Sequence, residues 1–334
     1  MRGLVALFLL LLGSTPAWAL SPQEGWDLVA AVENGNHEAY SRLVQAYQAG
    51  DSEAGVALGM LYLNGIAYPR DLEKARQYFE WAHGRGSGWA SWALAALYIN
   101  GLGVPRDLQK GFQYAKQSMD RGYPGGKAVY GLFLGAGQGG LKQDLDRGIR
   151  LIQEAAESGD PVALNALARY LAFFDHPKLP RNPQKAREYW EQAAAKGYYL
   201  ARSFLAYDLF FGLGGPPNQK RALELAKPFV GFDPVSTTVW AAALYFGQGG
   251  VPQDRPRACG MAKERAELFS GLGTIYGLCI LEGVVPGERA LGFAYLLVGA
   301  LDSHPLAQSL VPEWEKRLKP EEVNRAKELL KNLP

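Results

Sequence analysis

Apolar residues recur along most of the chain with the spacing of an α-helix. Bulky groups at positions i, i+3 or i+4, and i+7 form one apolar stripe on a helix, whereas a strand alternates apolar and polar positions. In one set of segments the stripe combines small and aromatic residues, as in Leu58-Gly59 with Tyr62 and Leu94-Ala95 with Tyr98. In a second set it is carried by pairs such as Tyr78 and Ala82, Trp190 and Ala193, and Leu225 and Phe229. The pattern predicts an all-α fold of alternating helices, here termed helix A and helix B.

The stretch that joins helix A to helix B repeats about every 36 residues. NGIAYPRDLEKARQYF begins at residue 64, and NGLGVPRDLQKGFQYA begins at residue 100. Asp and Asn side chains cap the first turn of a helix, and glycine supplies the positive φ at which many helices end. The predicted N-caps of helix B are Asp71, Asp107, Asp144, Asn182, Asn218 and Asp254. The glycines predicted to end helix A include Gly65, Gly101, Gly137 and Gly212.

Repetition of this loop predicts a structural joint. Arg289-Ala290 marks a seventh copy, and one hairpin cannot bury its apolar face alone, so about seven hairpins are expected to stack as a solenoid. GAGQGG, residues 135–140, satisfies the pattern G-x-G-x-x-G. A dinucleotide site needs a strand before that motif, and a helix is predicted there. The loop is therefore not expected to bind phosphate.

The repeated unit resembles the Sel1-like repeat, a relative of the tetratricopeptide repeat. The pattern A-x-x-x-L-G-x-x-Y-x-x-G-x-G-V-x-x-D-x-x-K-A is matched best by residues 54–75 and 90–111. The resemblance implies a right-handed α/α superhelix with residues 52–304 as the repeat solenoid. Residues 20–51 are expected to form an N-terminal capping hairpin, and residues 305–334 to form C-terminal capping helices.

The start of the chain has the layout of a secretory signal peptide. MRGLVALFLLLLGSTPAWA combines one arginine, a short apolar run and an Ala-Trp-Ala motif, which predicts a signal peptide over residues 1–19 and cleavage after Ala19. No later segment has the length of a membrane span. A periplasmic location is expected, with full secretion as the alternative.

Charge and histidine spacing exclude several kinds of ligand. Without Arg2 the chain has 34 basic and 33 acidic residues, a balance that argues against a nucleic-acid partner. The four histidines lie far apart, with none of the close spacings of a zinc site. We expect no metal, no cofactor and a monomeric protein.

The two cysteines are predicted to form a disulfide. Cys259 lies in helix B of the sixth unit and Cys279 in helix A of the seventh, each ten residues from a turn centred near Phe269. Equal distances from the turn place the two residues side by side, and an oxidising compartment would close the bond. Some secreted Sel1-like proteins link successive repeats across this turn, nearer its tip. The alternative is a pair of buried thiols.

Catalytic motifs are missing from the sequence. Neither G-x-S-x-G nor H-E-x-x-H occurs, and Ser91, Ser203 and Ser270 have no histidine partner that the sequence identifies. We expect no enzyme. The alternative, which the resemblance keeps open, is a periplasmic hydrolase acting on cell-wall peptides or β-lactam-like ligands.

The predicted function is that of an exported scaffold or adaptor in envelope assembly, signalling or host contact. In tetratricopeptide-like stacks the A helices line the concave side, where apolar residues can anchor a peptide or a helix. Trp89, Trp92 and Phe211 are the strongest candidate anchors. The alternative is that these side chains pack against the next repeat or a capping segment. The full set of candidate contacts with a partner protein is Val56, Met60, Leu63, Trp89, Trp92, Ile99, Tyr207, Phe210, Phe211 and Phe246.

Overall fold

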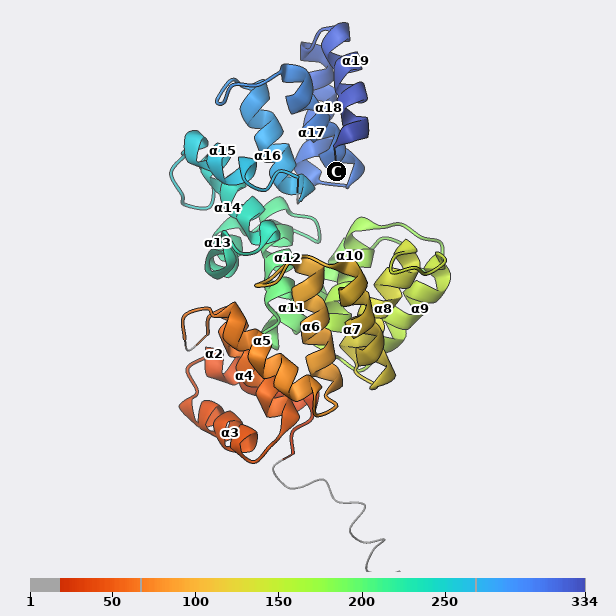
Figure 1. Ribbon diagram of the computed structural model, residues 1–334. Helices are drawn as coiled ribbons and strands as arrows, with labels where there is room; N and C mark the ends of the chain where they lie inside the picture. Colours follow the sequence, from red (N-terminus) through yellow and green to blue (C-terminus); the bar gives the residue numbers. More distant parts are fainter. Residues whose placement is uncertain (1–18, 67, 268, 334) are drawn as a thin grey trace, which may run out of the picture. The chain divides into compact units, whose positions relative to one another are not determined.

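The computed structural model describes residues 19–66, 68–267 and 269–333 (Figure 1). The described residues form eighteen α-helices, α2 to α19, and two short 3₁₀ helices, with no strand beyond an isolated bridge between His176 and Leu179. This confirms the all-α prediction. The predicted signal peptide lies outside the described residues except for Ala19.

Consecutive helices form hairpins along the chain. The N-terminal pair is α2 (Pro22–Glu33) and α3 (His37–Gln48). Four hairpins follow: α4 (Ser52–Asn64) with α5 (Leu72–His83), α6 (Gly88–Asn100) with α7 (Leu108–Asp120), α8 (Pro124–Ala136) with α9 (Leu145–Ala156), and α10 (Pro161–Phe173) with α11 (Pro183–Ala195).

Three further hairpins and two terminal helices complete the described chain. The hairpins are α12 (Tyr199–Phe211) with α13 (Gln219–Ala226), α14 (Pro234–Phe246) with α15 (Arg255–Lys263), and α16 (Ser270–Leu281) with α17 (Arg289–Leu301). The last elements are α18 (Pro305–Arg317) and α19 (Pro320–Leu329), and 3₁₀ turns follow α13 at Lys227–Phe229 and α19 at Leu330–Asn332. The hairpins from α4 to α17 number seven, as predicted.

The chain divides into two compact units. The first runs to Ala163 and includes Ala195–Gly197, and the second comprises Leu164–Ala194 and the chain from Tyr198 onward. Within the described residues no helix is long and apolar enough to cross a membrane.

The repeated polar and glycine columns have the predicted roles. In all six predicted caps the side-chain oxygen accepts a hydrogen bond from the backbone N–H three residues later, over 2.9–3.1 Å. The four predicted C-terminal glycines lie in the left-handed region, with φ between 66° and 74°. The loops between the helices of a hairpin are therefore structural joints.

Glycines in the facing helices let the two helices of a hairpin approach closely. A Cβ placed on Gly148 of α9 would lie 2.5 Å from the carbonyl oxygen of Gly131 in α8. The same distance separates a Cβ on Gly277 in α16 from the carbonyl oxygen of Gly292 in α17. Contacts this short leave no room for a side chain.

The predicted disulfide is present. Cys259 of α15 and Cys279 of α16 are bonded, with their Cα atoms 5.9 Å apart, and both side chains are fully buried. The bond closes a 20-residue separation and is expected to stabilise the second unit by about 3 kcal/mol.

Candidate protein-binding surface

Most residues proposed from the sequence as binding contacts are buried in the structure. The exposed fractions of seven side chains are between 0% and 4%: Val56, Met60, Leu63, Trp89, Trp92, Tyr207 and Phe210. Ile99 and Phe211 are half-buried, and Phe246 is 36% exposed. The binding prediction assumed that these side chains are exposed, and the first seven are not. Their role in binding remains a prediction.

The N-terminal hairpin covers Trp89 and Trp92. The ring of Trp26 in α2 lies 4.9 Å from the ring of Trp89 and 6.0 Å from that of Trp92. The neighbouring Gly25 leaves space for the indole, since a Cβ there would meet Trp89 at 2.4 Å. Trp89 and Trp92 therefore pack against the N-terminal hairpin, which is the alternative to exposure on a binding surface.

Two candidate contacts of the second unit pack against a buried histidine. The rings of Tyr207 and Phe211 lie 5.5 and 5.1 Å from His304. Both ring nitrogens of His304 are buried and have no hydrogen-bond partner among the described residues, and burial lowers the pKa of His304 to about 3. A neutral imidazole thus serves here as part of the apolar core.

The first unit carries a chain of touching aromatic side chains that are only partly buried. Tyr68, in the loop between α4 and α5, is 38% exposed. Its ring stacks on Tyr62 at 5.1 Å, and Tyr62 stacks on Tyr78 at 5.8 Å. Tyr47 contacts both Tyr78 and Trp81, at 5.2 and 4.6 Å. We define the aromatic strip as Tyr40, Tyr47, Tyr62, Tyr68, Tyr78 and Trp81.

The repeat explains only part of this strip. Tyr62 and Tyr78 belong to columns that recur in later hairpins, whereas Tyr68 and Trp81 do not. Gly55 lets Trp81 lie against α4, because a Cβ there would meet the indole at 2.7 Å. Aromatic residues outside the repeated columns are the sequence signal for this surface.

The strip is neutral and rich in hydroxyl groups. The hydroxyls of Tyr40 and Tyr68 lie 2.6 Å apart. Burial is the main cause that raises the pKa of Tyr40, and the hydrogen bond with the Tyr68 hydroxyl raises it further. Burial also raises the pKa of Tyr78, with a smaller contribution from the neighbouring tyrosines. These phenols therefore stay protonated near neutral pH and can donate hydrogen bonds.

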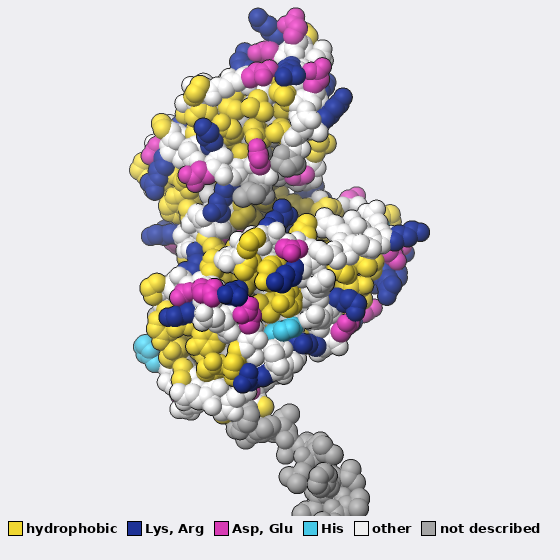
Figure 2. All heavy atoms as spheres, viewed as in Figure 1, with side chains coloured by type: hydrophobic (Ala, Val, Ile, Leu, Met, Phe, Trp, Pro, Cys, Tyr) yellow, Lys and Arg dark blue, Asp and Glu magenta, His cyan; other side chains and the backbone are white. Residues whose placement is uncertain are grey.

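Two cations border the strip. The guanidinium of Arg85 lies 3.8 Å from the centre of the Trp81 ring, and the ammonium of Lys74 lies 5.2 Å from that of Tyr62. In Figure 2, hydrophobic side chains coloured yellow gather over the α3–α5 region beside basic and acidic groups. Aromatic rings with an adjacent cation are typical of protein-binding hot spots.

One serine of the first unit lies within hydrogen-bond distance of a histidine. Ser91 Oγ is 3.0 Å from His83 Nδ1. Arg121 donates to the same Nδ1 at 3.0 Å and to Ser91 Oγ at 2.8 Å, and the Ser91 hydroxyl donates to the carbonyl oxygen of Ser87. Because Arg121 already occupies the Nδ1 lone pair and Ser91 is fully buried, the group resembles a structural network more than a nucleophile with its base.

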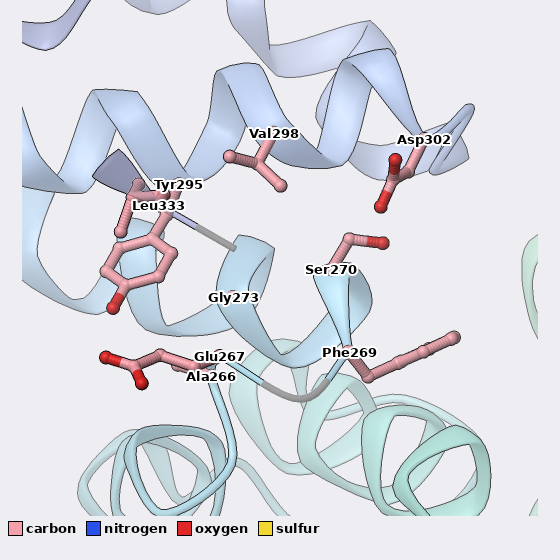
Figure 3. A pocket seen from close by; sticks show the side chains of 9 residues that line it. All are labelled: Ala266, Glu267, Phe269, Ser270, Gly273, Tyr295, Val298, Asp302 and Leu333. Carbon is pink, nitrogen blue, oxygen red and sulfur yellow. The ribbon is translucent and has the colours of Figure 1, made fainter. Parts of the chain in front are cut away.

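The other two serines considered in the sequence, Ser203 and Ser270, form no hydrogen bond with a histidine among the described residues. Ser203 is buried, donates to the carbonyl oxygen of Tyr199 and accepts a hydrogen bond from Ser236. Ser270 lines a pocket of about 210 Å³ in the second unit, beside Asp302 (Figure 3). The remaining lining residues are Ala266, Glu267, Phe269, Gly273, Tyr295, Val298 and Leu333. Within the described part of the chain, no group of histidine, cysteine and acidic residues is arranged to hold a metal ion.

Solved structures include several proteins similar to this chain. A protective antigen of uropathogenic Escherichia coli with an SLR fold is 19% identical, with a TM-score of 0.42, over 92% of this chain and 68% of the antigen. A Sel1 repeat protein from Oxalobacter formigenes is 19% identical, with a TM-score of 0.40, over 72% of this chain and 96% of that protein. A Sel1 repeat protein from Klebsiella pneumoniae is 24% identical, with a TM-score of 0.39, over 60% of this chain and 92% of that protein. The search of curated proteins found no match.

Family assignment follows from the repeats themselves. The Sel1 repeat model matches six segments, which together cover more than half of the chain: residues 52–82, 90–123, 127–160, 161–198, 200–228 and 240–263. With the capped, glycine-jointed hairpins described above, this match shows that the chain belongs to the Sel1 repeat family.

Proposed function

We propose that the protein is an exported interaction scaffold that binds a partner protein or peptide through the aromatic strip of its first unit. Sel1 repeat arrays typically mediate protein–protein interaction, which sets the functional class. The observation that carries the proposal is the partial exposure of six touching aromatic rings at one site. Exposure of aromatic surface to water is unfavourable, and its burial against a bound partner lowers the free energy of the complex.

The strip suits an extended segment with free carbonyl groups. Tyrosine and tryptophan offer large rigid contact surfaces with little loss of side-chain entropy on binding. The protonated phenols can donate to backbone carbonyls, while Arg85 and Lys74 favour a partner that carries acidic side chains. Ile99, Phe211 and Phe246 keep exposed surface and remain further candidate contacts.

Export is the second part of the proposal. It rests on the signal-peptide layout of residues 1–19, and the disulfide is compatible with an extracytoplasmic compartment. A periplasmic location is proposed, with envelope assembly, signalling or host contact as the setting. Fractionation of cells that produce the full chain tests this part directly.

A matched pair of crosslinking variants tests the binding surface. A photoreactive phenylalanine analogue replaces Tyr68 in one protein and Val104, the residue 36 positions later, in another. Irradiation in cells followed by mass spectrometry should recover one defined partner at position 68 and none at position 104. Trp81→Ala should then lower recovery at least tenfold, whereas the equivalent change Gln117→Ala should not. Equal recovery at both positions would refute the assignment of this surface.

A further inference from the structure

The predicted cleavage site adjoins a buried hydrogen bond. Leu20, the residue after the predicted cut, is only 8% exposed. Its backbone nitrogen donates to Oδ2 of Asp51 over 2.7 Å. The other carboxylate oxygen of Asp51 accepts from the backbone nitrogen of Ala54 and so caps α4. One side chain therefore joins the start of the described chain to the first repeat hairpin.

A second carboxylate lies close to Asp51. Glu53 is partly buried and accepts a hydrogen bond from the Ser87 hydroxyl over 2.9 Å. Burial, with the Asp51 charge as a further contribution, raises the pKa of Glu53 to about 7, against the opposing effect of Ser87. No lysine or arginine of the described chain forms an ion pair with Asp51 or Glu53. Two neighbouring acidic groups thus lie together without an ion-pair partner among the described residues.

Cleavage would place a cation at this position. Hydrolysis of the Ala19–Leu20 peptide bond by a signal peptidase consumes one water and leaves a carboxylate on Ala19 and an amine on Leu20. That amine takes up a proton near neutral pH, since an α-amino group has an ordinary pKa of about 7.7–8.0. A nitrogen that donated one N–H as an amide then carries three N–H groups and a positive charge.

We propose that removal of the signal peptide creates a buried ion pair between the α-ammonium group of Leu20 and the Asp51–Glu53 carboxylates. The amide nitrogen of Leu20 already lies at hydrogen-bond distance from Asp51, so the bond changes from a neutral to a charged donor without movement of the chain. The proposal rests on the export part of the proposed function and is independent of the aromatic strip.

The ion pair would couple processing to stability of the first unit. Asp51 caps α4, and Ser87, which donates to Glu53, caps α6. A charge at Leu20 therefore acts on the starts of two hairpins together. A retained leader would leave the acidic pair uncompensated, and the uncut protein would be the less stable form.

Three proteins that differ only at the N-terminus test the ion pair. The first begins at Leu20 with a free amine, the second is the same chain acetylated at that amine, and the third retains Ala19 as its first residue. We expect the free Leu20 form to melt at least about 4 °C above both others. NMR titration should place the Leu20 α-amino pKa at least about one unit above its ordinary value.

Two substitutions identify the partners of the amine. Asp51→Asn keeps a residue that can cap α4 but removes the charge, and Glu53→Gln keeps the size of the side chain. Each should reduce both the melting difference and the α-amino pKa shift. Equal melting of the free and acetylated forms, or an α-amino group that titrates normally, would overturn the ion pair.

Sequencing of the exported protein separates this inference from the proposed function. An N-terminus at Leu20 supports processing at the proposed bond, and any other N-terminus overturns the inference. Loss of partner crosslinking at position 68 would refute the binding proposal alone, because neither the melting comparison nor the titration depends on a partner.

Discussion

The hairpins α4–α5 and α6–α7 lie 36 residues apart in sequence and share one internal arrangement. Tyr62 stacks on Tyr78 at 5.8 Å in the first, and Tyr98 stacks on Tyr114 at 5.7 Å in the second. A lysine three residues after the helix B cap lies over the helix A ring in both hairpins, Lys74 at 5.2 Å and Lys110 at 4.1 Å. The repeated columns therefore fix how two helices pack.

The outer residues of the same hairpins differ. Where the first has Tyr68 and Trp81, the second has Val104 and Gln117, and the aromatic strip does not continue. Glu53 of the first corresponds to Trp89 of the second, which is buried under the N-terminal hairpin. Positions outside the columns thus decide whether a surface stays free or becomes part of the core.

The largest expected contrast is between the two tryptophans. Trp89→Ala removes a fully buried indole and should lower the free energy of unfolding of the first unit by about 3–5 kcal/mol. Trp81→Ala removes a partly exposed ring and should cost about 1 kcal/mol or less. Urea titration followed by circular dichroism measures both values. A similar loss for the two variants would contradict the division between core and surface.

A fall in pH should change the stability of α4 and of the start of α6 in opposite directions. Folding raises the pKa of Glu53 from an ordinary 4.5 to about 7. Protonation of Glu53 therefore stabilises the folded, uncut chain at low pH, and this stabilisation is lost as the pH rises from 4.5 to about 7. The loss of folding free energy is at most about 3 kcal/mol. Burial, and to a smaller extent the charge of Arg121, lowers the pKa of His83 below its ordinary value of 6.5. The neutral imidazole therefore stabilises the fold above pH 6.5, and this stabilisation is lost as the pH falls below that value. Hydrogen exchange between pH 8 and 5 should show amides of α4 becoming better protected and those at the start of α6 less protected.

Single substitutions serve as controls for this titration. Glu53→Gln should abolish the gain at α4, and His83→Gln should abolish the loss at α6. A change of the same sign in α4 and α6 would show that other groups dominate their response to pH.

The sequence could predict the elements of the fold because their signals are local. The Asp71 and Asp107 caps, the glycine joints and the Cys259–Cys279 pair each follow from spacing within one or two hairpins. The burial of Trp89 could not be predicted in this way, because it depends on Trp26, which lies 63 residues earlier in a segment that does not follow the repeat. The helix positions that face solvent in an idealised repeat are covered wherever a terminal segment packs on them.

The site was harder to predict than the fold for the same reason. Column comparison finds what the repeats have in common, whereas a binding surface needs residues that only one repeat carries. Tyr68 and Trp81 stand out only when each hairpin is compared with its neighbour for differences. Even then, contact between Tyr40 and Tyr68 requires the packing of α3 on the loop after α4, which spacing alone does not give.

The smallest effect should be the same in the two hairpins. Asp71 and Asp107 accept from the backbone N–H of Lys74 and Lys110 over the same 2.9 Å, and both carboxylates remain solvent-accessible. Asp71→Ala and Asp107→Ala should therefore each cost about 1 kcal/mol, while Asn at either position should cost less because it can still cap. Thermal melting of the four variants measures this. Unequal costs would mean that the loops are not equivalent joints and that the surface residues around Tyr68 also hold the first loop in place.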